Sequence, residues 1–224
     1  ANKFGMNLIT SKLDKPTIDD LICIYSKLDQ PIGNSSFIGA YHLFKMVSER
    51  NYKVCLTGDG ADELFGGYPT YQMTNLSRLW DLLPLKLSKL TGNLINKLPV
   101  SFELISFDYK IKQFLKSTNY KPHHPFYRCV FTPELANEVL STSDQPSLLR
   151  ILEPFNKSIN QSKARDFSLK NQALHLDFDT FLLNDHLPKI DRASMAFGVE
   201  ARNPFLDYRI YNLAFSNPHY FKFY

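Results

Sequence analysis

The sequence predicts an α/β fold, in which a parallel twisted sheet carries helices on both faces and a peripheral helical region is added. Two observations lead to this class. The apolar run 54–56 leads directly into a glycine-rich acidic loop, as a buried strand does at the edge of a sheet. The preceding segment 37–47 repeats apolar residues three and four positions apart, which is typical of a helix that packs on one face.

The first part of the chain is expected to contain a strand and a helix. Residues 1–12 are extended in character, and we expect a strand at residues 8–9. Thr17 then opens a helix, because its hydroxyl can cap free backbone N–H groups while Asp19 and Asp20 favour the positive end of the helix. The apolar face of this helix is expected to consist of Leu21, Ile22, Ile24, Tyr25 and Leu28.

A second helix is expected before the strand. The loop from Asp29 to Ser36 precedes it, and either Ser35 or Ser36 is predicted to be its cap. The helix returns the chain to the strand at Lys53. Its buried face is expected to contain Phe37, Ala40, Tyr41, Phe44 and Val47.

The loop after the strand carries three carboxylates within five positions, Asp59, Asp62 and Glu63, on a backbone loosened by Gly58 and Gly60. Such a group suits a divalent cation, a general base, or both. A solvated surface loop carries similar acids, so both interpretations stay open at this point. Ligands of open α/β sheets bind outside the carboxyl ends of the strands, which favours a site here.

Spacing excludes three better-known glycine loops. A Walker-type phosphate loop needs a lysine and a hydroxyl after its second glycine, and Gly60 is followed by neither. A dinucleotide fingerprint fails because Glu63 occupies the third glycine position. A calcium hand fails because Ala61 cannot ligate and Thr70 stands where the closing glutamate is required.

The middle of the chain, residues 73–161, is expected to form a peripheral helical insertion, since leucine- and lysine-rich stretches alternate there with proline and glycine. Its segment 110–128 mixes basic and aromatic residues, which also suits a nucleic-acid surface, but a solvated helical face is the favoured interpretation. His123 and His124 have no further ligands nearby in sequence, so no metal chemistry is assigned to them.

The last part, residues 162–224, is expected to be helical. One buried stripe is predicted there, with Lys170, Asp177 and Asp179 on other faces of the helix. A further helix begins at Pro188 and ends at Gly198. The residues of the buried stripe are Leu169, Ala173, Leu176 and Leu183.

Two cations of that last helix, Lys189 and Arg192, lie three positions apart and are therefore neighbours on its surface. They suit an ordinary exposed pair offset by Asp185 and Asp191. The alternative is a site that presents two cations to a phosphate or a carboxylate, for which arginine offers bidentate geometry.

Composition adds few restrictions. At 224 residues and 44 percent hydrophobic, the chain can bury a substantial core as one large domain or two small ones. The net charge of +4 is spread among acids, so neither a nucleic-acid nor a membrane partner is expected. Cys23, Cys55 and Cys129 are far apart and lack metal-ligand spacing, which predicts free thiols in a reducing compartment. With no signal peptide or long apolar run, cytoplasm is the expected location.

Two runs resemble the long motifs of glutamine-dependent asparagine synthetases: L-T-G-D-G-A-D-E-L-F-G-G-Y at 56–68, and the segment from Leu187 to Asp207. The resemblance continues through most of the chain and implies the interior part of the synthetase domain, with the ATP pyrophosphatase type of fold. Family members carry an amino-terminal glutaminase domain and an S-G-G-x-D-S pyrophosphate loop. Neither occurs here, so we expect an interior fragment of a longer protein, divided into an α/β nucleotide-binding part (1–72), the insertion (73–161) and a helical part that completes the site (162–224).

The resemblance also implies roles for individual residues. Thr57, Gly58 and Asp59 match positions that bind the nucleotide, and Asp62 matches the ligand of Mg²⁺ and pyrophosphate. Asp59 also matches the position of the base that accepts a proton from the attacking ammonia. Arg192 matches the position of a basic residue that faces the acyl-adenylate, and Lys189 lies close enough in the sequence to share that role.

Three further residues belong to the second motif. Glu200 and Arg202 are expected to form an ion pair that fixes a loop, and Asp207 is expected to cap the following helix.

The implied reaction uses ATP and Mg²⁺ to convert aspartate to asparagine through a β-aspartyl-adenylate, with ammonia derived from glutamine. AMP and pyrophosphate are the other products. A homodimer is the expected assembly. The alternatives are a relative that amidates another carboxylic acid, and a scaffold of the same fold without catalytic activity.

Overall fold

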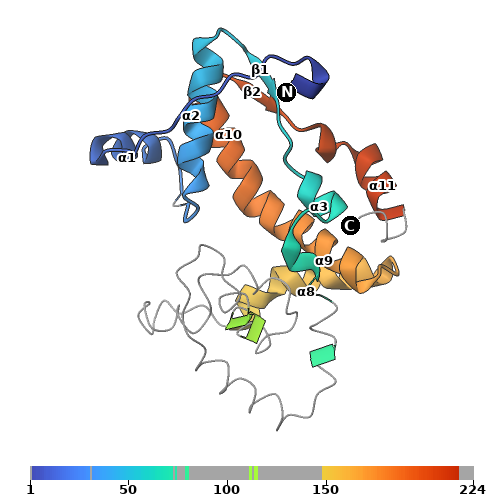
Figure 1. The fold of residues 1–224 in the computed structure, drawn as a ribbon. Helices are drawn as coiled ribbons and strands as arrows, with labels where there is room; N and C mark the ends of the chain where they lie inside the picture. The colour runs from blue at the N-terminus through green and yellow to red at the C-terminus, as the bar shows by residue number, and fades with distance from the viewer. Residues whose placement is uncertain are drawn as a thin grey trace. The chain divides into compact units, whose positions relative to one another are not determined.

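Figure 1 shows a computed structural model of the chain, which describes residues 2–30, 32–72, 74, 79–80, 111–112, 114–115 and 148–216. Most of the predicted insertion lies outside the described residues, including the two adjacent histidines, Cys129 and all of the segment 110–128 except residues 111–112 and 114–115. The chain forms two compact units: unit 1 is Ala1–Asp59 with Leu182–Asp207, and unit 2 is Gly60–Phe181 with Tyr208–Tyr224. The predicted division at residues 72 and 161 stays a prediction.

Unit 1 contains a parallel sheet of two strands in the described part of the chain: β1 (Val54–Leu56) and β2 (Glu200–Arg202). Val54 pairs with Glu200, and Leu56 pairs with Arg202. The α/β class and the strand at 54–56 are therefore confirmed. We expected a loop at residues 200–202, and β2 corrects that expectation. The strand forms because these residues pair with β1, which lies far away in the sequence. Their own pattern, one small residue between two charged ones, does not predict a strand.

Two helices of unit 1 are α1 (Ile18–Tyr25) and α2 (Ser36–Glu49). Thr17 caps α1 as predicted: its hydroxyl accepts from the Asp20 N–H, and the Asp20 carboxylate accepts from the Thr17 N–H at 2.9 Å. The prediction of a strand at residues 8–9 is wrong, since the whole segment 6–17 lacks regular structure. The side chains of Leu8 and Ile9 are both exposed.

The apolar face predicted for α1 is smaller than expected. Ile24 alone is buried there, Ile22 is exposed, and the helix ends before Leu28. The face predicted for α2 is confirmed at Phe37, Tyr41 and Phe44, which are all buried. The core of unit 1 combines these helices with α10 (Leu187–Met195) and the segment after it. Its buried members are Ile24, Phe37, Tyr41, Phe44, Ala193 and Val199.

Unit 2 is helical in its described part. It contains α3 (Ala61–Phe65), α8 (Leu148–Ala164), α9 (Leu169–Asp177) and α11 (Tyr208–Ser216). α8 and α9 pack together, and α3 contacts α9 and α11. Unit 1 also contains two short 3₁₀ turns, Asn2–Phe4 and Pro204–Leu206, and unit 2 contains one, Pro69–Gln72.

A π-helix, Phe178–His186, joins α9 to α10 and changes the phase of the helical surface. A π-turn bonds residue i to i+5 and so inserts an extra residue relative to an α-turn. As a result Leu182 is buried and Leu183 is exposed, which corrects the end of the predicted stripe. Leu169 is also exposed, whereas Ala173 and Leu176 are buried as predicted.

Asp177 corrects a second expectation for this helix. We predicted it on a face away from the core, but its side chain is buried and accepts a hydrogen bond from the Tyr71 hydroxyl at 2.8 Å. The core face of α9 is wide enough to include polar residues, provided that they find partners. Within the described part of the chain, no helix has the length and apolar character needed to cross a membrane.

Candidate active site

The ends of four elements lie on one side of unit 1. α2 leads into β1 and α10 leads into β2, so in each case the chain runs up the helix and back down the strand (Figure 1). Because β1 and β2 are parallel, both of their carboxyl ends lie on the same side as the amino-terminal ends of α2 and α10. This is the side on which open α/β sheets bind ligands.

The loop after β1 begins at Thr57, which is tied to the segment after β2. The Thr57 N–H donates to the Arg202 carbonyl at 2.9 Å, and the Thr57 hydroxyl donates to the side-chain oxygen of Asn203. Gly60 follows with a φ of 89°, a left-handed conformation that favours glycine. The backbone at Thr57 and Gly58 is therefore held at the end of the sheet, where we predicted nucleotide contacts.

Asp59 has an unusual environment. Its Oδ2 atom is buried and has no hydrogen-bond partner within the described part of the chain. A buried carboxylate oxygen without a donor costs free energy, about 1–3 kcal/mol for a typical polar group. Such an atom is expected where a ligand or a substrate supplies the missing donor.

Asp62 lies in unit 2, in α3, and its side chain is exposed. Gly67 faces it closely: a Cβ at Gly67 would lie 2.8 Å from Asp62 Cγ and overlap Oδ1. The neighbouring Glu63 is instead buried and accepts a hydrogen bond from the Tyr68 hydroxyl at 2.9 Å. The acids of the loop thus have different environments, and Glu63 is the structural one.

Three residues of one helical face contact the loop 29–36. Asp185, Lys189 and Arg192 follow at four- and three-residue spacing from the π-helix into α10, which places them on one side. Asp185 Oδ2 accepts from Asn34 Nδ2 at 3.0 Å. Asn34 Oδ1 in turn accepts from the Ser36 N–H at 3.0 Å and from its hydroxyl at 2.7 Å.

Asn34 therefore caps the start of α2, a role that we predicted for Ser35 or Ser36. Ser35 makes no side-chain capping bond at the start of α2, and Ser36 is the first residue of that helix. The short asparagine side chain reaches the first free N–H group of the helix, as in an Asx turn.

Lys189 is buried, with 3% of its surface exposed, so the alternative of an ordinary exposed pair is wrong for this residue. Its Nζ donates to Ser36 Oγ at 2.9 Å. A buried ammonium group needs oxygen atoms around it, because removing the charge from water is costly. The lysine charge is therefore held at the amino-terminal end of α2, where the helix dipole is also positive.

Arg192 is partly exposed and contacts two carboxylates. Its Nη2 lies 2.7 Å from Asp29 Oδ2, its Nε lies 3.2 Å from Asp29 Oδ1, and its Nη1 lies 2.5 Å from Asp191 Oδ2. The hydrogen bonds that Arg192 donates to Asp29 and to Asp191 raise the pKa of Arg192. The bond donated to Asp29 lowers the pKa of that carboxyl group. The guanidinium is thus already neutralised by protein carboxylates.

Glu200 and Arg202 form the predicted ion pair, with Nε–Oε1 at 2.8 Å and Nη2–Oε2 at 3.1 Å. The pair is exposed and lies in β2. Asp207 directly precedes α11, and its capping role stays a prediction.

Within the described residues, no three side chains of His, Cys, Asp and Glu gather as a metal site. Mg²⁺ does not require such a cluster, since it commonly uses one or two carboxylates together with phosphate oxygens and water. Asp62 fits that use, because its carboxylate is exposed and held against a glycine.

The family model described as asparagine synthase matches residues 1–223. The chain belongs to the asparagine synthase family. It is similar to a putative glutamine-hydrolyzing asparagine synthetase of Mycobacterium tuberculosis strain H37Rv (27% identity, 84% of this chain, 27% of that protein). It is also similar to glutamine-hydrolyzing asparagine synthetase 1 of Bacillus subtilis (26% identity, 90% of this chain, 30% of that protein).

A putative glutamine-hydrolyzing asparagine synthetase 2 of Methanocaldococcus jannaschii is 29% identical over 79% of this chain and 32% of that protein. The chain thus spans about a quarter to a third of the length of the curated relatives that it matches. No solved structure gives a significant match. The asparagine synthase family uses ATP, which agrees with a site at the carboxyl ends of the strands.

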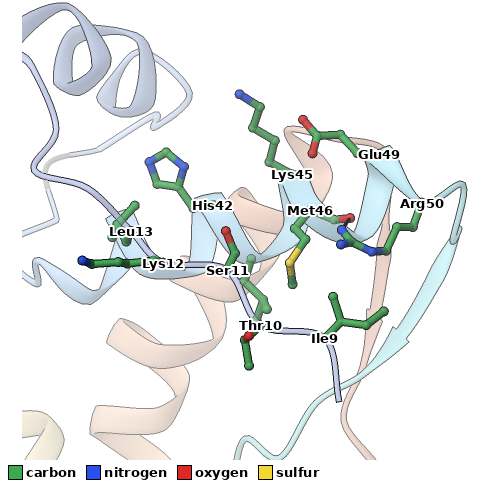
Figure 2. A pocket seen from close by; sticks show the side chains of 12 residues that line it. Ile9, Thr10, Ser11, Lys12, Leu13, His42, Lys45, Met46, Glu49 and Arg50 are labelled. Atoms are coloured by element: carbon green, nitrogen blue, oxygen red, sulfur yellow. Dashed lines mark hydrogen bonds between the residues drawn. The ribbon is translucent and has the colours of Figure 1, made fainter. Parts of the chain in front are cut away.

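A cavity of about 640 Å³ lies beside α2, between that helix and the segment 9–13 (Figure 2). Lys12, His42 and Lys45 are among the residues that line it, and Arg50 lies at its far end beside Glu49. It contains none of the residues that the asparagine synthase motifs single out. The candidate site is therefore not this cavity.

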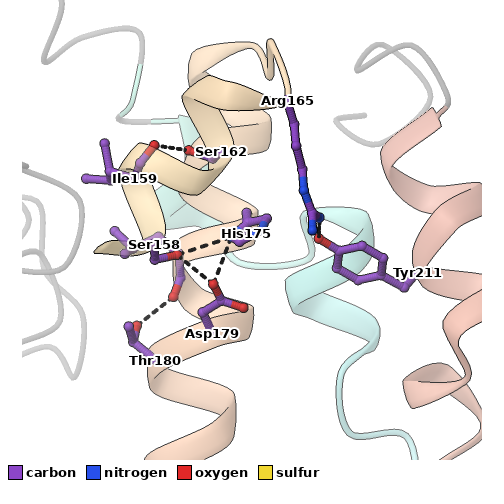
Figure 3. A network of polar contacts seen from close by, with 9 residues as sticks. Ser158, Ile159, Ser162, Arg165, His175, Asp179, Thr180 and Tyr211 are labelled. Carbon is purple, nitrogen blue, oxygen red and sulfur yellow. Dashed lines mark hydrogen bonds and ion pairs between the residues drawn. The ribbon is translucent and has the colours of Figure 1, made fainter. Parts of the chain in front are cut away.

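A polar cluster in unit 2 contains Ser158, His175 and Asp179 (Figure 3). Ser158 Oγ lies 3.1 Å from His175 Nδ1 and donates to Asp179 Oδ2 at 2.9 Å, and the same Nδ1 lies 3.1 Å from Asp179 Oδ2. A nucleophile triad needs the serine and the acid on opposite ring nitrogens. Because both contact Nδ1 here, the cluster is a structural network that joins α8 to α9.

Two contributors to the candidate site of this asparagine synthase family member were not predicted from the sequence. Asp29 was not recognised as the partner of Arg192, and Asp185 was treated only as a neighbouring charge. The spacing of Asp185, Lys189 and Arg192 was the available signal, since it predicts a shared face. The loop that this face contacts is about 150 positions away in sequence, which no local pattern reveals.

Proposed function

We propose that the full-length protein is an ATP-dependent amide-forming ligase that converts aspartate to asparagine. An oxygen of the side-chain carboxylate of the substrate aspartate attacks the α-phosphorus of ATP. The bond from that phosphorus to the oxygen that bridges to the β-phosphate breaks, and pyrophosphate leaves. The nitrogen of ammonia then attacks the acyl carbon and loses a proton. The bond from carbon to the AMP oxygen breaks, which yields asparagine and AMP.

The observation that carries this proposal is the buried Asp59 Oδ2 at the carboxyl end of β1, which has no hydrogen-bond partner among the described residues. Ammonia attack creates a nitrogen that carries a positive charge and must lose a proton. A carboxylate oxygen that is shielded from water and not occupied by a protein donor suits that task. Asp59 is therefore the proposed base.

The cations and the loop account for the first step. Pyrophosphate departure concentrates negative charge, which a buried ammonium such as that of Lys189 stabilises more strongly than an exposed one. Mg²⁺, held by Asp62 and by phosphate oxygens, would neutralise further charge on pyrophosphate. Thr57 and Gly58 are proposed to contact the adenosine part of ATP through the backbone held at the end of the sheet.

The ammonia is proposed to come from glutamine, because the similar proteins are named as glutamine-hydrolyzing. We also propose that a glutaminase domain releases this ammonia, that the protein is cytoplasmic and that it forms a homodimer. An asparagine synthase relative that acts on another carboxylic acid is the nearest alternative, since the residues that select the acid carry no motif. A non-catalytic scaffold is the other alternative.

The test is pyrophosphate release by the full-length protein with ATP, Mg²⁺, aspartate and ammonium, using wild type, Asp62→Asn and Asp59→Asn. We expect aspartate-dependent release that collapses in Asp62→Asn. In Asp59→Asn we expect pyrophosphate to form while the yield of asparagine is lost. Ser48→Ala is the control, because Ser48 donates to the Phe197 carbonyl at 3.1 Å and contacts none of the residues placed in the candidate site.

The outcomes separate the alternatives. Release that depends on a different acid would replace aspartate as the substrate. If no carboxylic acid supports pyrophosphate release, the non-catalytic scaffold remains as the interpretation. Normal asparagine yield in Asp59→Asn would remove Asp59 as the base.

A further inference from the structure

A chain of hydrogen bonds in unit 1 connects a buried cation to an anion. Lys189 Nζ donates to Ser36 Oγ at 2.9 Å, the Ser36 hydroxyl donates to Asn34 Oδ1 at 2.7 Å, and Asn34 Nδ2 donates to Asp185 Oδ2 at 3.0 Å. Each member donates to the next, so the polarity runs in one direction from the ammonium to the carboxylate.

The direction of the chain follows from the chemistry of its ends. An ammonium group has only donors and a carboxylate has only acceptors. The hydroxyl and the amide between them must each accept on one side and donate on the other. Asn34 is held in the required orientation because its Oδ1 also accepts from the Ser36 N–H at 3.0 Å. Hydrogen bonds in such a series polarise and strengthen one another.

The chain also connects two segments that the ion pair between Arg192 and Asp29 joins as well. Lys189 and Asp185 lie on one helical face, whereas Ser36 and Asn34 lie at the amino-terminal end of α2. An unbranched lysine side chain has many rotamers and loses much entropy when its end is localised. A directional acceptor at Ser36, itself oriented by Asn34, selects one position of the amine.

We infer that Asp185 positions the amine of Lys189 for pyrophosphate departure through Asn34 and Ser36. This inference rests on the proposed function. Lys189 is the group that faces the phosphates, while Ser36, Asn34 and Asp185 are positioning residues that act through it. Because a displacement of about 1 Å can reduce a rate by about 10²-fold, a positioning role for these residues has a measurable size.

The test is the rate of aspartate-dependent pyrophosphate release by the full-length protein with Ser36→Ala, Ser36→Thr and Asp185→Asn. We expect Ser36→Ala to lower kcat by about tenfold or more, with a smaller change in the KM for ATP, because the amine is displaced rather than lost. Ser36→Thr restores the rate, since it keeps the hydroxyl. Ser48→Ala removes a serine hydrogen bond from the same helix and is expected to change kcat by less than about twofold.

A double-mutant cycle separates positioning from a general structural role. If Ser36 acts through Lys189, Ser36→Ala has almost no further effect in a Lys189→Ala background. An equal loss in both backgrounds would overturn the inference, and so would a loss in Ser48→Ala as large as that in Ser36→Ala.

A second measurement does not depend on catalysis. Competitive acetylation of lysine side chains, read by mass spectrometry on the folded protein, reports how well each amine is protected. We expect Lys189 to be protected in wild type and labelled faster in Ser36→Ala and Asp185→Asn, with the other lysines and Ser48→Ala unchanged. If wild type releases no pyrophosphate with any acid, the proposed function fails while this result still decides whether the chain holds Lys189. Unchanged labelling in both variants would overturn the inference.

Discussion

Arg192 contacts Asp29 through two of its nitrogen atoms, with Nη2 2.7 Å from Oδ2 and Nε 3.2 Å from Oδ1, across 163 positions of sequence. The contact joins α10 to the loop before α2 and makes the arginine an anchor of that loop. Lys189, on the same face, is buried and contacts Ser36. The two cations that the sequence could not distinguish therefore have different surroundings.

We expect Lys189→Ala to reduce pyrophosphate release much more than Arg192→Ala. Loss of a buried charge that stabilises the departing phosphate costs about 10²–10³-fold in rate. Arg192 is already neutralised by Asp29 and Asp191, so its loss is expected to cost about tenfold through the position of the loop. Initial rates at saturating ATP and aspartate measure the difference, and a greater loss in Arg192→Ala would reverse the assignment.

Gly67→Ala is expected to raise the Mg²⁺ concentration needed for half-maximal activity. The new Cβ overlaps the end of the Asp62 side chain, which is flexible, so the carboxylate moves and the fold is retained. Gly39→Ala is the matched control, because a Cβ there meets nothing within 4 Å and alanine suits the interior of α2. A Mg²⁺ dependence that is unchanged in Gly67→Ala would argue against Asp62 as the ligand.

Tyr71→Phe is expected to lower the free energy of unfolding by about 1–3 kcal/mol, because the buried carboxylate of Asp177 loses a hydrogen-bond donor. Tyr208→Phe makes the same chemical change at an exposed position and is expected to stay within about 0.5 kcal/mol of wild type. Urea unfolding of the full-length protein compares the two. Equal effects would show that the hydrogen bond to Asp177 contributes nothing.

Asp179→Asn is expected to make the free energy of unfolding depend less on pH in the acid range. Burial acts to raise the pKa of Asp179, but the hydrogen bond and charge of His175, the Ser158 hydroxyl and the charge of Arg165 outweigh it and lower the pKa below its usual 3.8. A carboxylate with a lowered pKa in the folded state stabilises the fold above its unfolded pKa, and this contribution disappears as pH falls through the folded value.

Wild type should therefore lose stability between about pH 5 and pH 2 more steeply than Asp179→Asn. At pH 7 the variant is expected to be less stable by about 1 kcal/mol, a modest value because the side chain is a third exposed. Thermal melts across this range test both statements. Parallel pH profiles for the two proteins would contradict the role given to Asp179.

Local pattern was sufficient for several elements. The Thr17 cap, the buried face of α2 and the strand at 54–56 depend on residues within one turn or one short run, and each was predicted correctly. The end of the α9 stripe was not, because the π-helix shifts the phase that an α-helical period assumes. β2 was missed since its three residues pair with β1 from far away in sequence.

The family, the α/β class and the chemical groups of the site follow from the amino-acid sequence, because motif spacing and hydrophobic period are local properties of the chain. Which of these groups are buried and which are paired follows from the folded structure. There Lys189 is buried and Arg192 is not, Asp59 Oδ2 has no donor among the described residues, and Asp185 is connected to Ser36 through Asn34. The physical reason is that burial and hydrogen bonding depend on contacts between segments more than 100 positions apart, and no local pattern records those contacts.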